Sequence, residues 1–182
     1  MSQNVGPRKI VIGAAGMHDH GWIPTDIECL NVLNAADWNR FFSPGSIDAL
    51  LAEHVWEHLT PSEGACAAAL CFKYLRHGGY LRLAVPDGLH PDPHYREWVR
   101  AGGTGAGAHD HKVLYTCITF SALFEQVGFC CELLEYFDEQ GIFHDKVWSI
   151  QDGTIRRSKR FDERNRDGQL HYTSIAMDAH KI

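Results

Sequence analysis

Several features that would place a protein in another class are missing from this sequence. No apolar run approaches the roughly 18 residues of a membrane-spanning helix, and the N-terminus lacks the apolar segment of a signal peptide. The formal net charge is −6 at pH 7, and no basic cluster of the kind that binds a phosphate backbone offsets it. Internal repeats and low-complexity segments are also missing. We therefore expect a cytoplasmic protein that binds neither membranes nor nucleic acids.

The cysteines do not form a recognisable metal or redox motif. Six are present, none of them in a C-x-x-C pair, and several lie within apolar runs. Buried thiols in a reducing compartment fit this distribution better than disulfides or a cysteine metal site. The chain has 182 residues, 45% of them hydrophobic and 22% charged. This length and composition predict a single domain with a sizeable core.

We expect that domain to cover residues 1–182, with three segments outside its regular elements. Residues 1–7 form a tail, and residues 141–170 form a polar, turn-rich insertion before the last strand. Residues 88–118 are expected to be a mobile lid or substrate segment. Their glycine-rich stretch, 102–107, is not followed by the GK[ST] of a phosphate-binding loop, so a hinge is the expected role.

The middle of the chain predicts a strand, a helix and a second strand with short connections. Residues 47–52 are an apolar run long enough for a buried strand, and 61–74 are Ala-rich with apolar residues at helical spacing. The Gly78-Gly79 pair should end the helix, and residues 80–85 form the next strand. Such a unit implies a parallel sheet with a right-handed crossover.

The remaining elements can be placed on either side of this unit. Before it, residues 9–13 predict a central strand, 22–26 a second strand, 30–34 a third and 36–42 a short helix. After it, three further elements are predicted, namely a helix over 119–127, a strand over 129–137 and a last strand over 172–179 that pairs antiparallel with it.

The carboxyl ends of parallel strands are where ligands bind in such sheets. Glu53 and His54 follow one predicted strand, and Pro86 and Asp87 follow the next. We therefore expect these residues on one functional rim.

Three stretches resemble the class I S-adenosylmethionine-dependent methyltransferases, in particular the small "type 11" proteins. Residues 47–59 resemble their fourth strand and its loop, 74–87 their "LKPGG" turn and fifth strand, and 124–129 their "L..aGF" passage into the sixth strand. The resemblance spans residues 9–137. It implies an α/β fold with a Rossmann-like, mostly parallel sheet, a C-terminal antiparallel strand and helices on both faces, reduced between the first and fourth strands.

The N-terminal half departs from that family's pattern. Two helices of ordinary length and two strands do not fit between Gly13 and Ile47. The loop from Gly13 to Gly16 is also one glycine short of the family's GxGxG-like pattern. The resemblance therefore implies a compact relative, either an active enzyme or a non-catalytic binding or partner protein.

The resemblance also implies S-adenosylmethionine as cofactor and assigns its site. The backbone of Gly13, Ala15 and Gly16 would contact the methionine moiety, and the Asp26 carboxylate would bind the ribose hydroxyls. The Asn34 amide would lie near the adenine, and Glu53 would stand at the pocket mouth.

The candidate catalytic residues are His54 and Asp87. Methyl transfer depends mainly on alignment, and a base is needed only where the nucleophile carries a proton. His54 could serve as that base. The acceptor is expected to be a small molecule or a glycan-type compound, and a homo-oligomer could complete the pared-down pocket.

Two histidine patterns raise the question of a metal. Residues 54–58 match H-x-x-E-H, the inverted zincin motif, which needs a helix across those residues and offers no obvious third ligand here. A zinc-dependent hydrolase is therefore a further alternative. The HDH triplets at 18–20 and 109–111 could together form a metal site. Twelve histidines make chance clustering easy, so we expect no resident metal.

Overall fold

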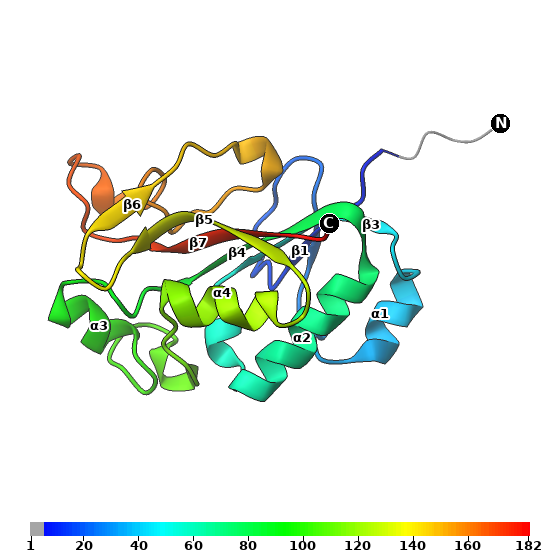
Figure 1. Ribbon diagram of the computed structural model, residues 1–182, viewed down its shortest axis with the longest axis horizontal. Helices are drawn as coiled ribbons and strands as arrows, with labels where there is room; N and C mark the ends of the chain where they lie inside the picture. Colours follow the sequence, from blue (N-terminus) through cyan, green and yellow to red (C-terminus); the bar gives the residue numbers. More distant parts are fainter. Residues whose placement is uncertain (1–5) are drawn as a thin grey trace.

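The computed structural model describes residues 6–182, and a seven-stranded sheet organises them (Figure 1). The strand order is β2-β1-β3-β4-β7-β5-β6. The first four strands in the sequence run parallel, whereas β7 is antiparallel to both β4 and β5, and β6 is antiparallel to β5. The strands are β1 Lys9–Ile12, β2 Ile23–Thr25, β3 Ile47–Glu53, β4 Leu75–Pro86, β5 Cys130–Phe137, β6 Phe143–Asp145 and β7 Ser174–His180. The predicted Rossmann-like sheet, with parallel N-terminal strands and an antiparallel last strand, is confirmed.

One face of the sheet carries the main helices and the larger core. The helices are α1 Ala35–Phe41, α2 Pro61–Tyr74, α3 Pro93–Val99 and α4 Cys117–Glu125. Trp38 of α1, Cys71 of α2 and Phe120 of α4 pack on alternate residues of the strands, such as Leu50 of β3 and Met177 of β7. In Figure 1 these helices lie below the sheet, and α3 lies beyond its end on the same side.

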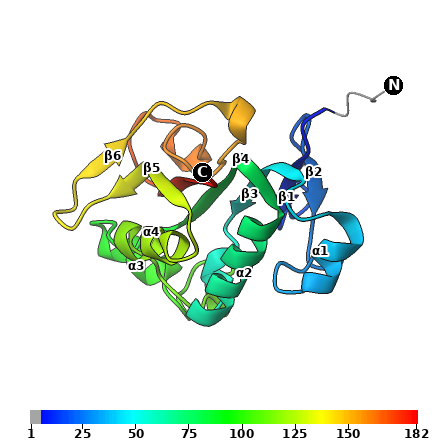
Figure 2. The same ribbon diagram turned by 45° about the vertical axis from the view of Figure 1, so that its right-hand side comes forward.

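The opposite face is covered by irregular chain, which corrects the expected helices on both faces. Trp22 packs on Val11 and Leu51, while Trp148 and Ile155 pack in a second cluster with strand residues of β4, β5 and β7. These side chains come from segments 13–22 and 146–162, which Figure 2 shows above the sheet. A parallel crossover normally needs a dozen or more residues, so the link from β1 to β2 is too short for a helix.

Three local expectations need correction. Residues 30–34 form turns that lead into α1 instead of a strand, and Leu30 and Val32 are core residues there. The Gly78-Gly79 pair lies inside β4 and not at the helix end, in an irregular stretch where the register against β3 shifts. The helix expected over 119–127 is α4, which begins two residues earlier after its N-cap Thr116, whose hydroxyl accepts from the Thr119 N–H. The remaining predicted strands and helices form close to their expected positions.

Within the described residues, no helix combines the length and apolar character needed to cross a bilayer.

Candidate functional site

A groove of about 420 Å³ lies at the carboxyl ends of β1, β2 and β3. We call it the β1 groove. Its walls come from within residues 12–15, 26–33 and 54–59, and Asp110 stands at its edge. This is the place in a parallel sheet where ligands bind, and its volume is within the 300–1,000 Å³ typical of ligand pockets.

The loop after β1 turns sharply where it borders this groove. Gly13, Ala15 and Gly16 all have positive φ, of 65°, 48° and 77°. A Cβ at Gly13 would lie 2.8 Å from Cγ2 of Val55, so only glycine lets the loop approach the segment after β3. Positive φ at a residue with a side chain costs roughly 1–2 kcal/mol, and such strain collects at functional sites. Ala15 carries that strain at the groove wall.

Asp26 stands at the end of β2 and connects the two segments of this wall. Its Oδ1 accepts a hydrogen bond of 2.9 Å from the Ala15 N–H, and the Ala14 N–H donates to the Thr25 carbonyl. The carboxylate therefore fixes the loop conformation and lines the groove with it. Next to it, Ile27 presents an apolar side chain that is 69% exposed.

Two of the residues predicted to bind the cofactor lie outside the β1 groove. Asn34 is the N-cap of α1, where its side chain accepts from the Ala36 N–H and donates to Asp37. Glu53 lies on the face of β3 opposite the helices, and its Oε1 accepts from the Arg157 N–H at 2.6 Å. Neither residue lines the β1 groove. Gly13, Ala15 and Asp26 do line it, and Gly16 lies one residue further along the loop.

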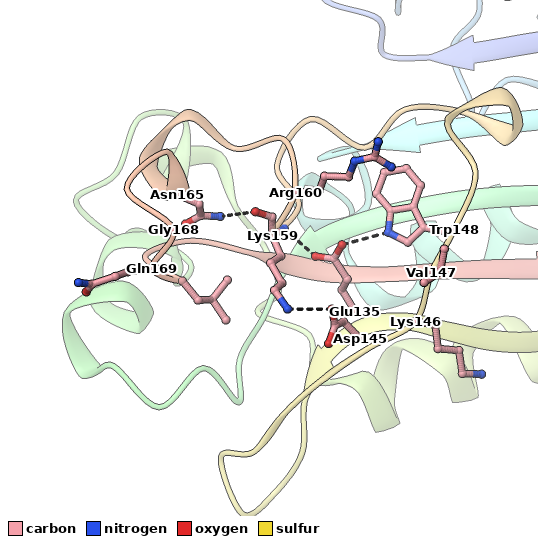
Figure 3. A pocket seen from close by; sticks show the side chains of 11 residues that line it. Glu135, Asp145, Lys146, Val147, Trp148, Lys159, Arg160, Asn165, Gly168 and Gln169 are labelled. Atoms are coloured by element: carbon pink, nitrogen blue, oxygen red, sulfur yellow. Dashed lines mark hydrogen bonds and ion pairs between the residues drawn. The ribbon is translucent and has the colours of Figure 1, made fainter.

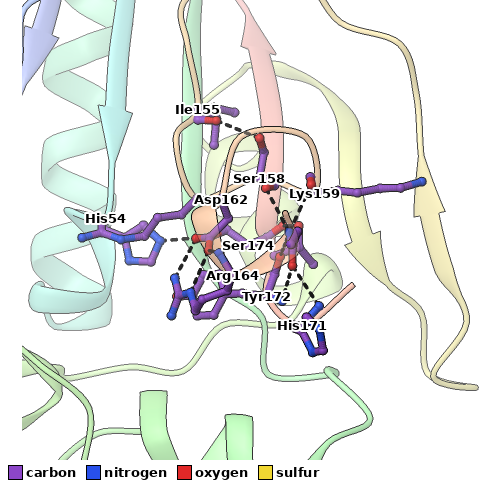
Figure 4. A network of polar contacts seen from close by, with 12 residues as sticks. His54, Ile155, Ser158, Lys159, Asp162, Arg164, His171, Tyr172 and Ser174 are labelled. Carbon is purple, nitrogen blue, oxygen red and sulfur yellow. Dashed lines mark hydrogen bonds and ion pairs between the residues drawn. The ribbon is translucent and has the colours of Figure 1, made fainter. Parts of the chain in front are cut away.

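His54 stands at the point where β3 ends and the chain turns. Its φ is 55°, and its Nδ1 lies 2.8 Å from Oε1 of Glu57. Its Nε2 lies 3.0 Å from the Ser174 hydroxyl (Figure 4). Since a carboxylate can only accept, Nδ1 carries the proton and Nε2 is free to accept from Ser174. Burial raises the pKa of Glu57, but the adjacent His54 outweighs it and holds that pKa below its usual value.

The inverted zincin arrangement is not formed. The positive φ of His54 breaks the helix that the motif requires, and only Trp56–His58 form a single 3-10 turn. Both ring nitrogens of His54 are already engaged, by Glu57 and Ser174. His54 is therefore turned away from the position that a motif ligand would take.

Asp87 does not line the β1 groove. It instead connects the end of β4 to the end of β5. Its Oδ1 accepts from the Leu89 N–H at 2.8 Å, and its Oδ2 accepts from the Phe137 N–H, at the end of β5, at 2.7 Å. The residue is fully buried, and burial raises its pKa to about 6. These contacts are structural, and the catalytic role of Asp87 stays a prediction.

A second cavity, of about 240 Å³, lies on the other side of His54. We call it the β4 cavity, because Pro86 at the end of β4 lines it. His111 enters it from the segment after α3, and Arg157 and Arg164 enter from the insertion. His54 lines both spaces, so the β1 groove and the β4 cavity meet at its ring.

A polar network holds the insertion against this cavity (Figure 4). The Arg164 guanidinium lies 3.4 Å from the Tyr172 ring centroid and forms two hydrogen bonds of 2.7 Å with Asp162. The Asn165 side-chain amide donates to the carbonyls of Lys159 and Tyr172. The network makes the wall of the β4 cavity a fixed structure although the segment contains little regular structure.

A third cavity, of about 440 Å³, lies between the β5–β6 hairpin and the insertion (Figure 3). Its buried acid is Glu135, which accepts from the Trp148 indole, the Lys159 N–H and the Thr173 hydroxyl. A fully satisfied carboxylate of this kind holds structure and leaves no acceptor free for a ligand. The cavity is lined by residues of β5, β6 and the insertion, and none of its lining residues belongs to a parallel strand. We therefore place the functional site at His54.

The sequence did not reveal several residues of this site. Arg157, Arg164 and Tyr172 belong to no motif, and the insertion has no periodicity that would place them. Glu57 and His111 were marked only by separate histidine patterns, and nothing in the sequence shows that those patterns meet.

Neither the family models nor the curated proteins include a match to this sequence. Solved structures do match over nearly its whole length. A methyltransferase dependent on S-adenosylmethionine from Archaeoglobus fulgidus has a TM-score of 0.53 at 14% identity, covering 96% of this chain and 85% of that one. A possible histamine N-methyltransferase from Thermotoga maritima has a TM-score of 0.58 at 10% identity, covering 97% and 83%.

A third match was solved with the cofactor. It is phosphoethanolamine N-methyltransferase 2 of Haemonchus contortus in complex with S-adenosyl-L-methionine, with a TM-score of 0.50 at 13% identity, covering 97% of this chain and 49% of that one. The strand order and the antiparallel β7 indicate the same fold as these structural matches do.

The chain has the class I methyltransferase fold.

Within this methyltransferase fold, the residues of the β1 groove fit S-adenosylmethionine. Asp26 offers a carboxylate for a ribose diol, the loop after β1 offers backbone at close range, and Ile27 offers an apolar surface for a base. The helix that usually follows β1 is not formed, because residues 13–22 are turns and coil. The groove therefore lacks the N-terminus of a helix after β1, which would attract the carboxylate of the methionine moiety.

Proposed function

We propose that the chain is an S-adenosylmethionine-dependent methyltransferase. The cofactor binds in the β1 groove, and a small-molecule or glycan-type acceptor binds in the β4 cavity. The observation that carries this proposal is that His54 lines both spaces. A single side chain between two ligand spaces is suited to align a methyl donor with an acceptor.

The residues of the groove divide the recognition of the cofactor between them. Asp26 accepts hydrogen bonds from the ribose hydroxyls, and the backbone of Gly13, Ala15 and Gly16 contacts the methionine moiety. Ile27 packs against the adenine. When bound, S-adenosylmethionine supplies an electrophilic methyl group at the boundary with the β4 cavity.

His54 acts at that boundary as a base for acceptors that carry a proton. Glu57 holds the Nδ1 proton at 2.8 Å, which leaves Nε2 as the basic nitrogen. The Ser174 hydroxyl occupies Nε2 in this structure, so an acceptor hydroxyl or amine would take its place. Orienting a base by a buried carboxylate in this way is common in catalytic sites.

The β4 cavity indicates the class of acceptor. Arg157 and Arg164 bring guanidinium groups to it, and the Trp98 and Tyr172 rings form an aromatic wall. Cationic and aromatic groups together favour a small acceptor with acidic or hydroxyl substituents. The volume of about 240 Å³ favours a compact molecule.

Transfer of a tritiated methyl group from S-adenosylmethionine to small acidic and hydroxylated acceptors tests this proposal. We expect His54→Ala to lower turnover by about 10²- to 10⁴-fold, the usual contribution of a general base. Binding of S-adenosylhomocysteine should change little. His77→Ala, which removes an exposed histidine far from the groove, should retain activity. Equal turnover in the wild type and His54→Ala would contradict the role of His54.

The shortened N-terminal half favours one other function, a non-catalytic binding protein with the methyltransferase fold. This alternative predicts no transfer of the tritiated methyl group to any acceptor. It also predicts no specific binding of S-adenosylhomocysteine, because the β1 groove would no longer bind a cofactor. Binding together with turnover would exclude it.

A further inference from the structure

Three side chains from two distant segments meet beside His54. Ligand atoms of Glu57, His58 and His111 all lie within 4.8 Å of one another. Glu57 and His58 belong to the 3-10 turn after β3, and His111 follows a second short turn at Ala108–Asp110. The two histidine rings pack edge to face, with centroids 4.8 Å apart.

Backbone hydrogen bonds hold the two segments together. The N–H groups of Lys112 and Val113 donate to the Glu57 carbonyl, at 2.6 and 3.3 Å. The arrangement therefore does not depend on the side chains alone.

The ring of His111 is oriented as metal-binding histidines usually are. Its Nδ1 lies 2.7 Å from the Val99 carbonyl. A carbonyl can only accept, so Nδ1 carries the proton and Nε2 has a free lone pair. A backbone carbonyl behind the ring commonly fixes the tautomer of a histidine ligand.

Glu57 carries an unmet requirement for a positive partner. The residue is fully buried, and one oxygen contacts Nδ1 of His54. Within residues 6–182, Oε2 of Glu57 accepts no hydrogen bond. A buried carboxylate oxygen without a donor is costly, and a cation would satisfy it.

We propose that Glu57, His58 and His111 bind one divalent transition-metal ion, with Zn²⁺ favoured by the donor set. Two imidazoles and a carboxylate are ligands that Zn²⁺ accepts in three-residue sites. Asp110 stands beside the cluster, with its Oδ2 3.3 Å from Nδ1 of His58. Ligand bonds of about 2.1 Å in a tetrahedron place ligand atoms roughly 3.4 Å apart, so binding would draw the three side chains closer together.

This site differs from both histidine patterns in the sequence. Of H-x-x-E-H, only Glu57 and His58 take part, and His54 supports Glu57 from behind. Of the two HDH triplets, only the one at 109–111 contributes. The expectation of no resident metal is thus replaced by a specific candidate.

The place of the ion would connect it to the two ligand spaces. His58 and Asp110 line the β1 groove, and His111 lines the β4 cavity. With three protein ligands, one coordination position stays open for an oxygen or nitrogen donor of a ligand. The metal site does not require cofactor binding and is tested separately from it.

The test is a titration of the full-length, tag-free chain with Zn²⁺ after dialysis against a chelator. Calorimetry should show one ion per chain, and Co²⁺ should give the visible absorption of a tetrahedral site. We expect His111→Ala and Glu57→Gln each to weaken binding at least tenfold. His109→Ala is the matched control, since it removes an exposed histidine from the same triplet, and it should bind as the wild type does.

Thermal unfolding provides a second readout that also shows whether each variant folds. Zn²⁺ should raise the unfolding temperature of the wild type and His109→Ala, but not that of a folded His111→Ala. Binding of less than one ion per chain by the wild type would overturn the proposal. So would equal affinities in the wild type and His111→Ala, or an equal loss in His109→Ala.

Discussion

Asp87 shows how a residue on the predicted functional rim can stabilise the fold. Both of its oxygens accept backbone hydrogen bonds, from Leu89 and Phe137. Asp87→Ala leaves the buried Phe137 N–H and the part-buried Leu89 N–H without acceptors. At 1–3 kcal/mol for each unsatisfied group, we expect urea denaturation to show a loss of about 2–4 kcal/mol in unfolding free energy.

The same variant distinguishes structure from catalysis. Because Asp87 lies outside the β1 groove, the folded fraction of Asp87→Ala should bind S-adenosylhomocysteine as the wild type does. Lost binding with unchanged stability would instead place Asp87 in the site.

The raised pKa of Asp87 predicts a pH dependence of stability. Burial raises this pKa to about 6, from the usual 3.8 of an aspartate, so between these values the native state holds a proton that the unfolded state has released. By linkage, this group's contribution to stability is full below about pH 4 and is lost as the pH rises to about 6. The loss is on the order of 2–3 kcal/mol.

Comparing the wild type with Asp87→Asn separates the effect of Asp87 from that of the other acidic residues, because an amide at this position does not titrate. The difference in unfolding free energy, wild type minus variant, should fall as the pH is raised from 4 to 6. Parallel pH profiles would show that the pKa of Asp87 is not raised.

The sequence located residues of this kind but could not orient them. A residue that follows a buried strand must lie at the sheet rim, which is why His54 and Asp87 were both expected there. Their partners depend on long-range pairing. Phe137 reaches Asp87 only because β5 pairs with β7, and no local pattern reports that pairing.

At the scale of elements, regular periodicity was enough to predict the helices and the main strands. The helix expected at 61–74 coincides with α2, where Thr60 and Glu63 form a capping box. The insertion was different, because its core contacts come from single apolar residues in a polar segment. Trp148 and Ile155 cover the second face of the sheet, a role that no spacing pattern could indicate.

Arg82 of β4 anchors that insertion to the sheet. It is almost fully buried, forms two hydrogen bonds of 2.7 Å with Asp178 of β7, and donates to the carbonyls of Ser149 and Gly153. Arg82→Ala leaves Asp178 buried and unpaired, which typically costs about 3–5 kcal/mol. We expect that loss in chemical denaturation.

The matched control is Arg76→Ala on the same strand. Arg76 pairs with Asp48 at 2.6 Å, but the arginine side chain is 50% exposed, and exposed pairs contribute no more than about 1 kcal/mol. Equal losses for the two variants would mean that Arg82 does not act as the anchor.

For the whole molecule, the fold retains the β1 groove at the carboxyl ends of the parallel strands while lacking a helix after β1. The sequence predicted this reduction from the length of one segment, and the structure shows that Trp22 and the insertion fill the space. A cofactor bound here would rely on Asp26 and the loop backbone. The expected cytoplasmic location and a homo-oligomer that completes the pocket stay predictions.

Thermal unfolding with and without S-adenosylmethionine and S-adenosylhomocysteine, each at about 1 mM, tests the central claim most directly. A ligand at a hundredfold its dissociation constant adds about 2.7 kcal/mol to the native state, a shift of several degrees for a domain of this size. We expect both ligands to stabilise the wild type and Glu28→Ala, whose exposed acid lies outside the groove. Asp26→Ala should lose most of the shift, whereas no shift in the wild type with either ligand would contradict the account.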